Sequence, residues 1–300
     1  MERGHRMAEF ELIADYKDDE RYRLSFNRLT NTVFGFDLEE WYRKGFWNER
    51  YLPYSFIDGD EVIANVSVNK MDLILQGEKK KAVQIGTVMT HPDYRGQGLS
   101  RRLMNLVLTE YENEADFFYL FANKNVLNFY PKFGFEPGTE SQFTATIAAT
   151  GRKRIGRARK MNPFDPETLR HLYEMASSRK PVSRVFGVEN AHNLVMFYCL
   201  KVFSDCLYYI EAEAVLAICQ TQDRVLHVYD LISSEEFDIH GVIATIADAE
   251  VERMVFHFTP DLLGLKTDDL PLVAVNDTFF VRGGSFRIDQ SFKYPIIAQA

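Results

Sequence analysis

The residues best suited to chemistry form a short glycine-rich segment, Arg95-Gly96-Gln97-Gly98-Leu99-Ser100. Two near-adjacent glycines let a backbone approach a ligand closely and adopt conformations that other residues avoid. The segment leaves a predicted strand and enters a predicted helix, whose first amide groups lack intrahelical partners and favour an anion. We therefore expect it to hold a pyrophosphate, although a tight strand-to-helix turn without a ligand would use the same residues.

Two common phosphate-binding loops do not fit this segment. A Walker A loop requires Gly-x-x-x-x-Gly-Lys followed by Ser or Thr, and the sequence contains no such run. A dinucleotide-binding loop requires a third glycine at the position where this chain has Arg101. That loop also lies at the first turn of its fold, whereas several predicted strands precede the segment here. The predicted anion site belongs to another class.

The elements that position this segment alternate between strands and helices. Apolar runs separated by turn signals predict strands over 54–57, 62–68, 83–89, 117–121 and 142–148. Apolar residues at helical spacing predict helices over 22–33, 99–114 and 125–132. The Asp58-Gly59 pair between the first two strands is typical of a hairpin. The order predicts an α/β fold with a mixed sheet, in which one strand feeds the glycine-rich segment.

Two blocks resemble the acetyl-CoA motifs of the GNAT N-acetyltransferase superfamily. The first, 85–100, carries that family's Gln/Arg-x-x-Gly-x-Gly/Ala pattern after a strand and a Pro-x-Tyr-Arg run. The second, 123–135, resembles the family's Asn…Phe-Tyr…Gly-Phe element and follows at the expected spacing. One position departs, because Ser100 stands where the family has Gly or Ala. Serine is nearly as small, and its hydroxyl could donate to phosphate or cap the helix.

The resemblance implies a role for each matching residue. The backbone of Val88, Met89 and Thr90 is expected to pair with the pantetheine arm of acetyl-CoA, as an added strand would. Asn123 is expected to contact the same arm. The pyrophosphate is expected to be wrapped by Arg95, Gly96, Gln97, Gly98, Leu99, Ser100 and Arg101.

Tyr130 matches the family's general acid. Attack of a neutral amine on a thioester ends with a departing thiolate, and a nearby phenol can give that sulfur a proton. The alternative role for Tyr130 is packing against Phe133 and Phe135. No general base is assigned, because Asp37, Glu39 and Glu40 are the nearest carboxylates to the aromatic stretch and read as surface residues. 

An aromatic-rich stretch over 34–54 holds both tryptophans of the chain. Such a stretch is typical of a core. It could instead line an acceptor pocket, where cation–π contacts would favour an amine.

Composition narrows the partners that suit the chain. The net charge of −8 argues against a nucleic-acid partner, which requires a basic face, and better suits a cationic amine acceptor. The three cysteines, Cys199, Cys206 and Cys219, lack metal-site spacing and predict buried thiols in a reducing compartment, with no metal. Without an apolar run of roughly 18 residues or a signal-peptide pattern, no membrane partner is expected and a cytoplasmic protein is predicted.

The chain is predicted to divide into a catalytic domain at 1–150, a basic linker at 151–163 and a second domain at 164–300. The linker is basic, so a nucleic-acid patch is an alternative there. In the second part, Asp165-Pro166 predicts a helix start, a further helix is expected over 191–203, and strands are expected over 215–219, 224–231, 254–258 and 272–281. This order resembles a degenerate second GNAT copy without a phosphate loop, which implies lost cofactor binding.

The resemblance as a whole implies an enzyme that moves an acetyl group from acetyl-CoA, as co-substrate, to a primary amine of a small molecule. Two alternatives stay open, a sensor that binds acyl-CoA without turnover and an acetyltransferase that acts on protein amines. The acceptor itself is not predicted, since acceptor pockets are built from variable loops.

Overall fold

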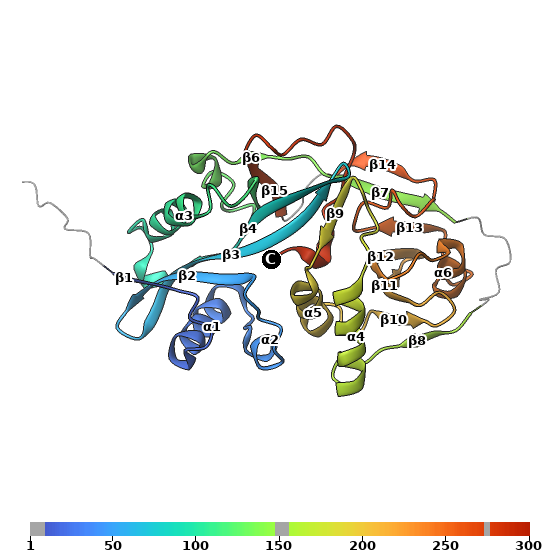
Figure 1. Ribbon diagram of the computed structural model, residues 1–300, viewed down its shortest axis with the longest axis horizontal. Helices are drawn as coiled ribbons and strands as arrows, with labels where there is room; N and C mark the ends of the chain where they lie inside the picture. Colours follow the sequence, from blue (N-terminus) through green and yellow to red (C-terminus); the bar gives the residue numbers. More distant parts are fainter. Residues whose placement is uncertain (1–9, 148–155, 273–276) are drawn as a thin grey trace, which may run out of the picture.

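The computed structural model describes residues 10–147, 156–272 and 277–300. Over these residues the strands form two mixed sheets that lie side by side, with helices packed on both faces of each (Figure 1). The fold class is therefore mixed α/β, as the alternating order of elements predicted.

The first sheet has the order β1-β2-β3-β4-β5-β15-β6, and β9 also pairs with β3. Its strands are β1 (Glu11–Ala14), β2 (Tyr51–Asp58), β3 (Glu61–Leu75), β4 (Glu78–Thr90), β5 (Phe117–Asn123), β6 (Glu136–Pro137), β9 (Phe186–Glu189) and β15 (Asp277–Arg282). Helices α1 (Glu20–Phe34) and α2 (Glu39–Arg43) lie on one face and α3 (Leu99–Glu110) on the other (Figure 1).

The second sheet has the order β14-β7-β13-β12-β11-β10-β8. Its strands are β7 (Ser141–Thr146), β8 (Ala158–Lys160), β10 (Leu207–Ile210), β11 (Val215–Gln222), β12 (Val225–Ile232), β13 (Arg253–Phe256) and β14 (Asp268–Pro271). Helices α4 (Pro166–Ser178) and α5 (His192–Lys201) cover the face toward the first sheet, and α6 (Ile239–Ile246) covers the other (Figure 1).

The same strand–helix–strand unit occurs once in each sheet. In the first, β4 leads through α3 into β5, which pairs parallel to β4. In the second, β12 leads through α6 into β13, which pairs parallel to β12. Each unit is preceded by an antiparallel neighbour, β3 and β11 respectively. The second part of the chain thus repeats the topology of the first.

The two sheets exchange strands across the predicted domain boundary. The strand expected to close the first sheet forms as β7 but pairs with β13 and β14 in the second sheet. The late strand β15 pairs instead with β5 and β6 in the first sheet. Periodicity predicts that a strand exists and says nothing of its partner, so sequence analysis placed each in the sheet of its own half. Part of the predicted linker, 151–155, lies outside the described residues.

A shared apolar core also joins the two halves. Phe26 and Trp41 of the first half lie in one buried cluster with Leu172 and Cys199 of the second. The indole Nε1 of Trp41 donates a hydrogen bond to the backbone oxygen of Asn193 at 2.8 Å. Removing either half would expose these large side chains to water.

Most predicted elements are confirmed, one is wrong, and several short strands and the helices α2 and α6 were not predicted. The helix starts are confirmed by their caps, since Asp19 accepts from the first amides of α1 and Asp165 from Thr168 of α4. The helix predicted over 125–132 is wrong: only a 3₁₀ turn, η2 (Tyr130–Phe133), forms there, because Asn123 turns the chain by accepting from the amide of Asn125. Helix α6 was not predicted, since it is apolar on most sides and rich in β-branched residues.

Candidate active site

The site begins at a bulge in β4. Asn65 pairs with Met89 and Ser67 with Gly86, so Thr87 and Val88 together stand opposite one residue of β3. Thr87 has a φ of +47°, the left-handed conformation that such a bulge uses. The parallel pairing of β4 with β5 stops at Ile85–Leu120, just before the bulge. Beyond it the two strands part, which leaves the β4 edge over Val88–Thr90 facing a gap.

Two buried side chains hold the bulge. The Nδ2 atom of Asn65 donates to the backbone oxygen of Thr87 at 2.9 Å. The hydroxyls of Tyr51 and Thr87 lie 2.6 Å apart. Tyr51 comes from the aromatic stretch, so part of that stretch is structural support for the site. The bulge and the parted strand edge are therefore held by buried side chains of the fold.

The glycine-rich segment adopts the form that its residues predict. Gly96 and Gly98 have φ values of +79° and +76°, and Gly98 is the N-cap of α3. No side chain caps this helix, so its first amides are open to an anion. A hollow of about 420 Å³ lies over the segment, and it is lined by Thr90, Tyr94, Arg95, Gly96, Gly98, Leu99, Ser100, Arg101 and Phe129.

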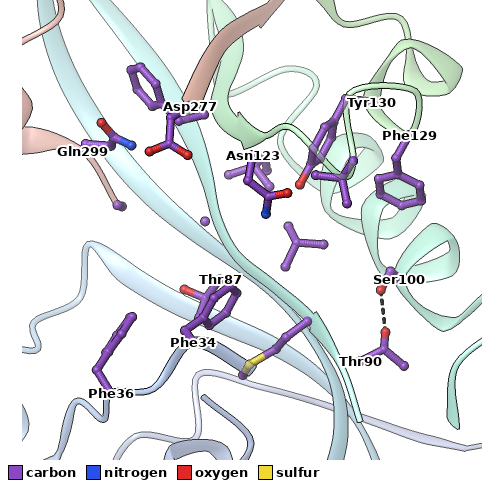
Figure 2. A pocket seen from close by; sticks show the side chains of 17 residues that line it. Phe34, Phe36, Thr87, Thr90, Ser100, Asn123, Phe129, Tyr130, Asp277 and Gln299 are labelled. Atoms are coloured by element: carbon purple, nitrogen blue, oxygen red, sulfur yellow. Dashed lines mark hydrogen bonds between the residues drawn. The ribbon is translucent and has the colours of Figure 1, made fainter. Parts of the chain in front are cut away.

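Ser100 does something that the sequence did not indicate. Its hydroxyl lies 2.6 Å from the hydroxyl of Thr90 (Figure 2). The bond joins the end of β4 to the first turn of α3. Gly or Ala at position 100 could not form this hydrogen bond. Gln97 is exposed and does not line either hollow described here.

A second hollow of about 510 Å³ adjoins the first and shares Thr90, Ser100 and Phe129 with it. Figure 2 shows the phenol oxygen of Tyr130 pointing into it, next to Asn123. The pocket joins both halves of the chain. Its lining is Phe34, Phe36, Ile85, Gly86, Thr87, Val88, Met89, Thr90, Ser100, Phe121, Asn123, Val126, Phe129, Tyr130, Asp277, Gln299 and Ala300.

Tyr130 is only 6% exposed and sits at the start of η2. Its ring packs edge-on against Phe129 and Phe135, so the packing role that sequence analysis considered is also present. Within the described residues its hydroxyl has no hydrogen-bond partner. Burial raises the pKa of Tyr130 to about 12, so the phenol keeps its proton at neutral pH. A neutral buried phenol is suited to donate a proton.

The buried amide of Gln84 joins the end of the segment 292–300 to β4. Gln84 donates from Nε2 to the backbone oxygen of Ala298 at 3.0 Å, and its Oε1 accepts from the amide of Ala300 at 2.7 Å. Ala300 packs directly on Gly86, where an added Cβ would lie 3.2 Å from its carbonyl carbon. A side chain at position 86 would therefore crowd Ala300, and the close contact brings Gln299 and Ala300 to the pocket wall.

The aromatic stretch divides between core and pocket. Trp41, Trp47 and Tyr51 are buried together, with Trp41 and Trp47 stacked at 5.9 Å. Phe34 and Phe36 instead line the pocket. The core interpretation thus holds for most of the stretch, and its start lines a pocket; an acceptor role for these rings stays a prediction.

None of the carboxylates weighed as a base lines the pocket. Glu39 pairs with Arg23 and Arg43, and hydrogen bonds from these two lower its pKa against the effect of burial. Glu40 pairs with Lys201 at 3.1 Å, and Asp37 accepts from the amide of Glu39. All three have structural partners.

Sequence analysis missed Asp277, Gln299 and Ala300, and only the fold brings them to the site. Asp277 is the first residue of β15 and pairs with Asn123. It lies more than 140 residues from Tyr130 along the chain and in no motif. A carboxylate that follows no local pattern carries no signal that could have found it.

Comparisons with known proteins agree with this geometry. A sequence profile described as "Acetyltransferase (GNAT) domain" matches residues 18–138. Residues 18–138 are a GNAT acetyltransferase domain. They hold the bulge, the glycine-rich segment and Tyr130. A search against curated proteins finds no match.

Solved structures extend the likeness in fold to both halves. A GCN5-related N-acetyltransferase from Kribbella flavida matches with a TM-score of 0.56 at 20% identity, over 91% of this chain and 72% of that one. Eis1 from Mycobacterium abscessus matches with a TM-score of 0.55 at 15% identity, over 91% of this chain and 72% of that one. A probable N-acyltransferase from Enterococcus faecalis V583 matches with a TM-score of 0.57 at 17% identity, over 93% of this chain and 73% of that one. The chain therefore has two GNAT-like domains.

The second GNAT-like domain lacks the features that suit a pyrophosphate. At the start of α6, Asp238 accepts from the amides of His240 and Gly241, so a carboxylate of the chain already occupies the helix terminus. The preceding loop carries Glu235 and Glu236, both exposed, where the first domain has arginine and glycines. These negative charges would repel a pyrophosphate.

The described residues were also considered as metal ligands, as membrane-spanning helices and as thiols. Within residues 10–147, 156–272 and 277–300, no group of three or more His, Cys, Asp or Glu side chains could hold a metal ion. No helix in the same residues is long and apolar enough to cross a membrane. The three cysteines are buried, and Cys199 and Cys206 lie in one core cluster, as expected.

Proposed function

We propose that this protein transfers the acetyl group of acetyl-CoA to a primary amine of a small molecule, with Tyr130 as general acid. The observation that carries the proposal is the continuity of the two hollows. The glycine-rich segment, the parted strands β4 and β5 and the Tyr130 hydroxyl line one path through shared residues. A pyrophosphate at the first hollow would place a pantetheine arm along Val88–Thr90 and its thioester near Tyr130.

The residues present fit such a co-substrate. The amides at the start of α3 have no side-chain cap, and the left-handed glycines leave open space over the loop, since a Cβ at Gly96 or Gly98 would meet nothing within 4 Å. Arg95 and Arg101 line the same hollow and add positive charge. An anion is favoured there by both the helix terminus and these guanidinium groups.

The chemistry assigns one proton transfer to the chain. Acetyl-CoA supplies a thioester, and the amine attacks it after giving one proton to water. The nitrogen–carbon bond forms and the carbon–sulfur bond breaks while Tyr130 gives its proton to the leaving sulfur. The nitrogen then loses its second proton, which restores the phenol, so one proton is released per turnover. The raised pKa of Tyr130 keeps the donor form available at neutral pH.

Substitution of Tyr130 tests the assignment. We expect Tyr130→Phe to lower kcat roughly 100-fold or more while leaving acetyl-CoA affinity within about threefold, measured by thiol release and calorimetry. Tyr111→Phe is a matched control, because Tyr111 is equally buried but hydrogen-bonds to Tyr54 outside the pocket. Its kcat should be unchanged. Acetyl-CoA binding without turnover in the unmodified protein would instead support the sensor alternative, and unchanged kcat in Tyr130→Phe would remove Tyr130 from the mechanism.

A further inference from the structure

The pocket has two ends of different chemistry. In Figure 2, Ser100 and Thr90 lie at one side, Phe36 and Gln299 at the opposite side, and Tyr130 with Asn123 between them. The side at Ser100 continues into the hollow over the glycine-rich segment. If the proposed function holds, the co-substrate enters from that side, and the acceptor must enter from the side of Phe36 and Gln299.

Among the side chains that line the pocket, the acceptor side has one that is charged. Asp277 is the single acidic side chain among the described residues that line the pocket, and no Lys or Arg lines it. Figure 2 shows its carboxylate directed into the pocket between Gln299 and Asn123. No residue of the described chain forms an ion pair with Asp277, whereas Glu39 pairs with Arg23 and Arg43 and Glu40 pairs with Lys201. The position is fixed by the register of β15, since Asp277 stands opposite Asn123.

The rest of the acceptor side is aromatic and open. Phe34 and Phe36 are 41% and 38% exposed, and their rings stack at 6.1 Å. Phe36 also packs against Phe197 of α5 at 5.9 Å, so the second domain supports this wall. Exposed aromatic rings at the mouth of a pocket mark a surface that an apolar ligand can cover.

We propose that the acceptor is a monocationic amine with an aromatic or bulky apolar body, of the arylalkylamine class. The ammonium group binds Asp277, and the body lies over Phe34 and Phe36. This inference rests on the proposed function and names its substrate class. A polyamine or aminoglycoside would bring further cationic groups against the phenyl rings, where each would lose water and no second acidic side chain lines the pocket to pair with it.

The experiment compares 2-phenylethylamine with spermidine and ethylamine as acceptors, using thiol release from acetyl-CoA. We expect kcat/KM to be at least about tenfold higher for 2-phenylethylamine than for either other amine. Only this amine combines a single ammonium group for Asp277 with an aromatic ring for Phe34 and Phe36. Acetyl-CoA binding is measured in parallel by calorimetry. A higher kcat/KM for spermidine overturns the inference and leaves the transferase function standing. If the protein binds acetyl-CoA but acetylates none of the three amines, both this inference and the proposed function are overturned.

Two variants test the carboxylate of Asp277 and the aromatic wall separately. Asp277→Asn should lower kcat/KM for 2-phenylethylamine about 10- to 100-fold, mainly through KM, with acetyl-CoA affinity unchanged. Phe36→Ala should lower kcat/KM for 2-phenylethylamine about three- to tenfold but leave that for ethylamine unchanged. The controls are Asp268→Asn and Phe164→Ala, which alter exposed residues outside the pocket. Equal effects of a variant and its control would overturn the assignment.

Discussion

At the residue scale, the proposed chemistry rests on features of Tyr130 and Gly98. Tyr130 combines burial, a raised pKa and a hydroxyl that faces the pocket without a hydrogen-bond partner in the described chain. Gly98 combines the helix N-cap position with a left-handed backbone that leaves the first amides of α3 uncovered. The first feature concerns a proton and the second an anion, so each can be tested by its own measurement.

The pH dependence of turnover tests the proposed proton donation by Tyr130. Burial holds the Tyr130 pKa near 12, above the ordinary value of 10, so the phenol stays protonated and able to donate up to pH 10. We expect kcat to rise or stay level from pH 7 to pH 10, since the amine also becomes neutral over this range. Stopped assays against pH measure it. A fall in kcat with a midpoint near pH 9 would contradict the role of a neutral phenol.

Substitution of Gly98 tests the anion site. In Gly98→Ala the methyl group meets no atom within 4 Å, so the cost comes from the left-handed backbone, about 1–2 kcal/mol of unfolding free energy. We expect acetyl-CoA affinity to fall about tenfold as the loop shifts to relieve that strain. Gly59→Ala is the matched control, because Gly59 has a φ of +60°, equally open surroundings and a place in the β2–β3 turn. It should lose similar stability and no affinity.

At the scale of elements, two units of the same topology differ in what caps their helix. The β4–α3–β5 unit has an uncapped helix start and parted strands, while the β12–α6–β13 unit has Asp238 on its first amides. In the second unit the strand pairing continues to Phe256, the last residue of β13, so the strands do not part within it. Sequence analysis expected a second copy without cofactor binding, and these differences supply a physical reason for it.

Binding stoichiometry tests that difference. We expect calorimetry to find one acetyl-CoA per chain, because the acidic loop and the capped helix of the second domain disfavour a pyrophosphate. Gly98→Ala should weaken this single event without revealing another. A second binding event of comparable affinity would show that the second domain also binds acetyl-CoA.

At the scale of the whole molecule, the strand exchange makes each sheet depend on both halves. Without β15 the outer edge of β5 would be unpaired, and Phe279 and Phe280 would be lost from the buried clusters. The segment 292–300 further ties the second half to Gln84. The same exchange places Asp277 in the pocket, so the pairing that covers the edge of β5 also supplies a pocket carboxylate.

Cooperativity of unfolding tests the exchange. We expect the intact chain to unfold in one transition, observed alike by fluorescence and circular dichroism in urea. A fragment of residues 1–147 expressed alone should show no cooperative transition, because its exposed strand edge and apolar residues favour aggregation. Co-expression with residues 156–300 should restore a folded pair that purifies together. A fragment of 1–147 that folds cooperatively by itself would contradict this dependence.

The sequence by itself determined what local patterns can carry. Asp-Gly between apolar runs predicted the β2–β3 hairpin, and Asp165-Pro166 predicted the start of α4. The glycine-rich segment predicted an open helix terminus, because φ preferences and unpaired amides are properties of neighbouring residues. The residue roles at Tyr130 and Asn123 came from the family resemblance, and they stay predictions.

Only the tertiary structure decided which strands pair and what completes the pocket. β7 and β15 were predicted as strands, yet pairing depends on backbone groups that are alike in every strand, so their exchange left no mark in the periodicity. Asp277 reaches Asn123 through that exchange, and Phe36 is held at the pocket wall by packing against Phe197 of the second half. Long-range packing set the end of the pocket that holds Asp277, while local sequence set the open helix terminus at the glycine-rich segment.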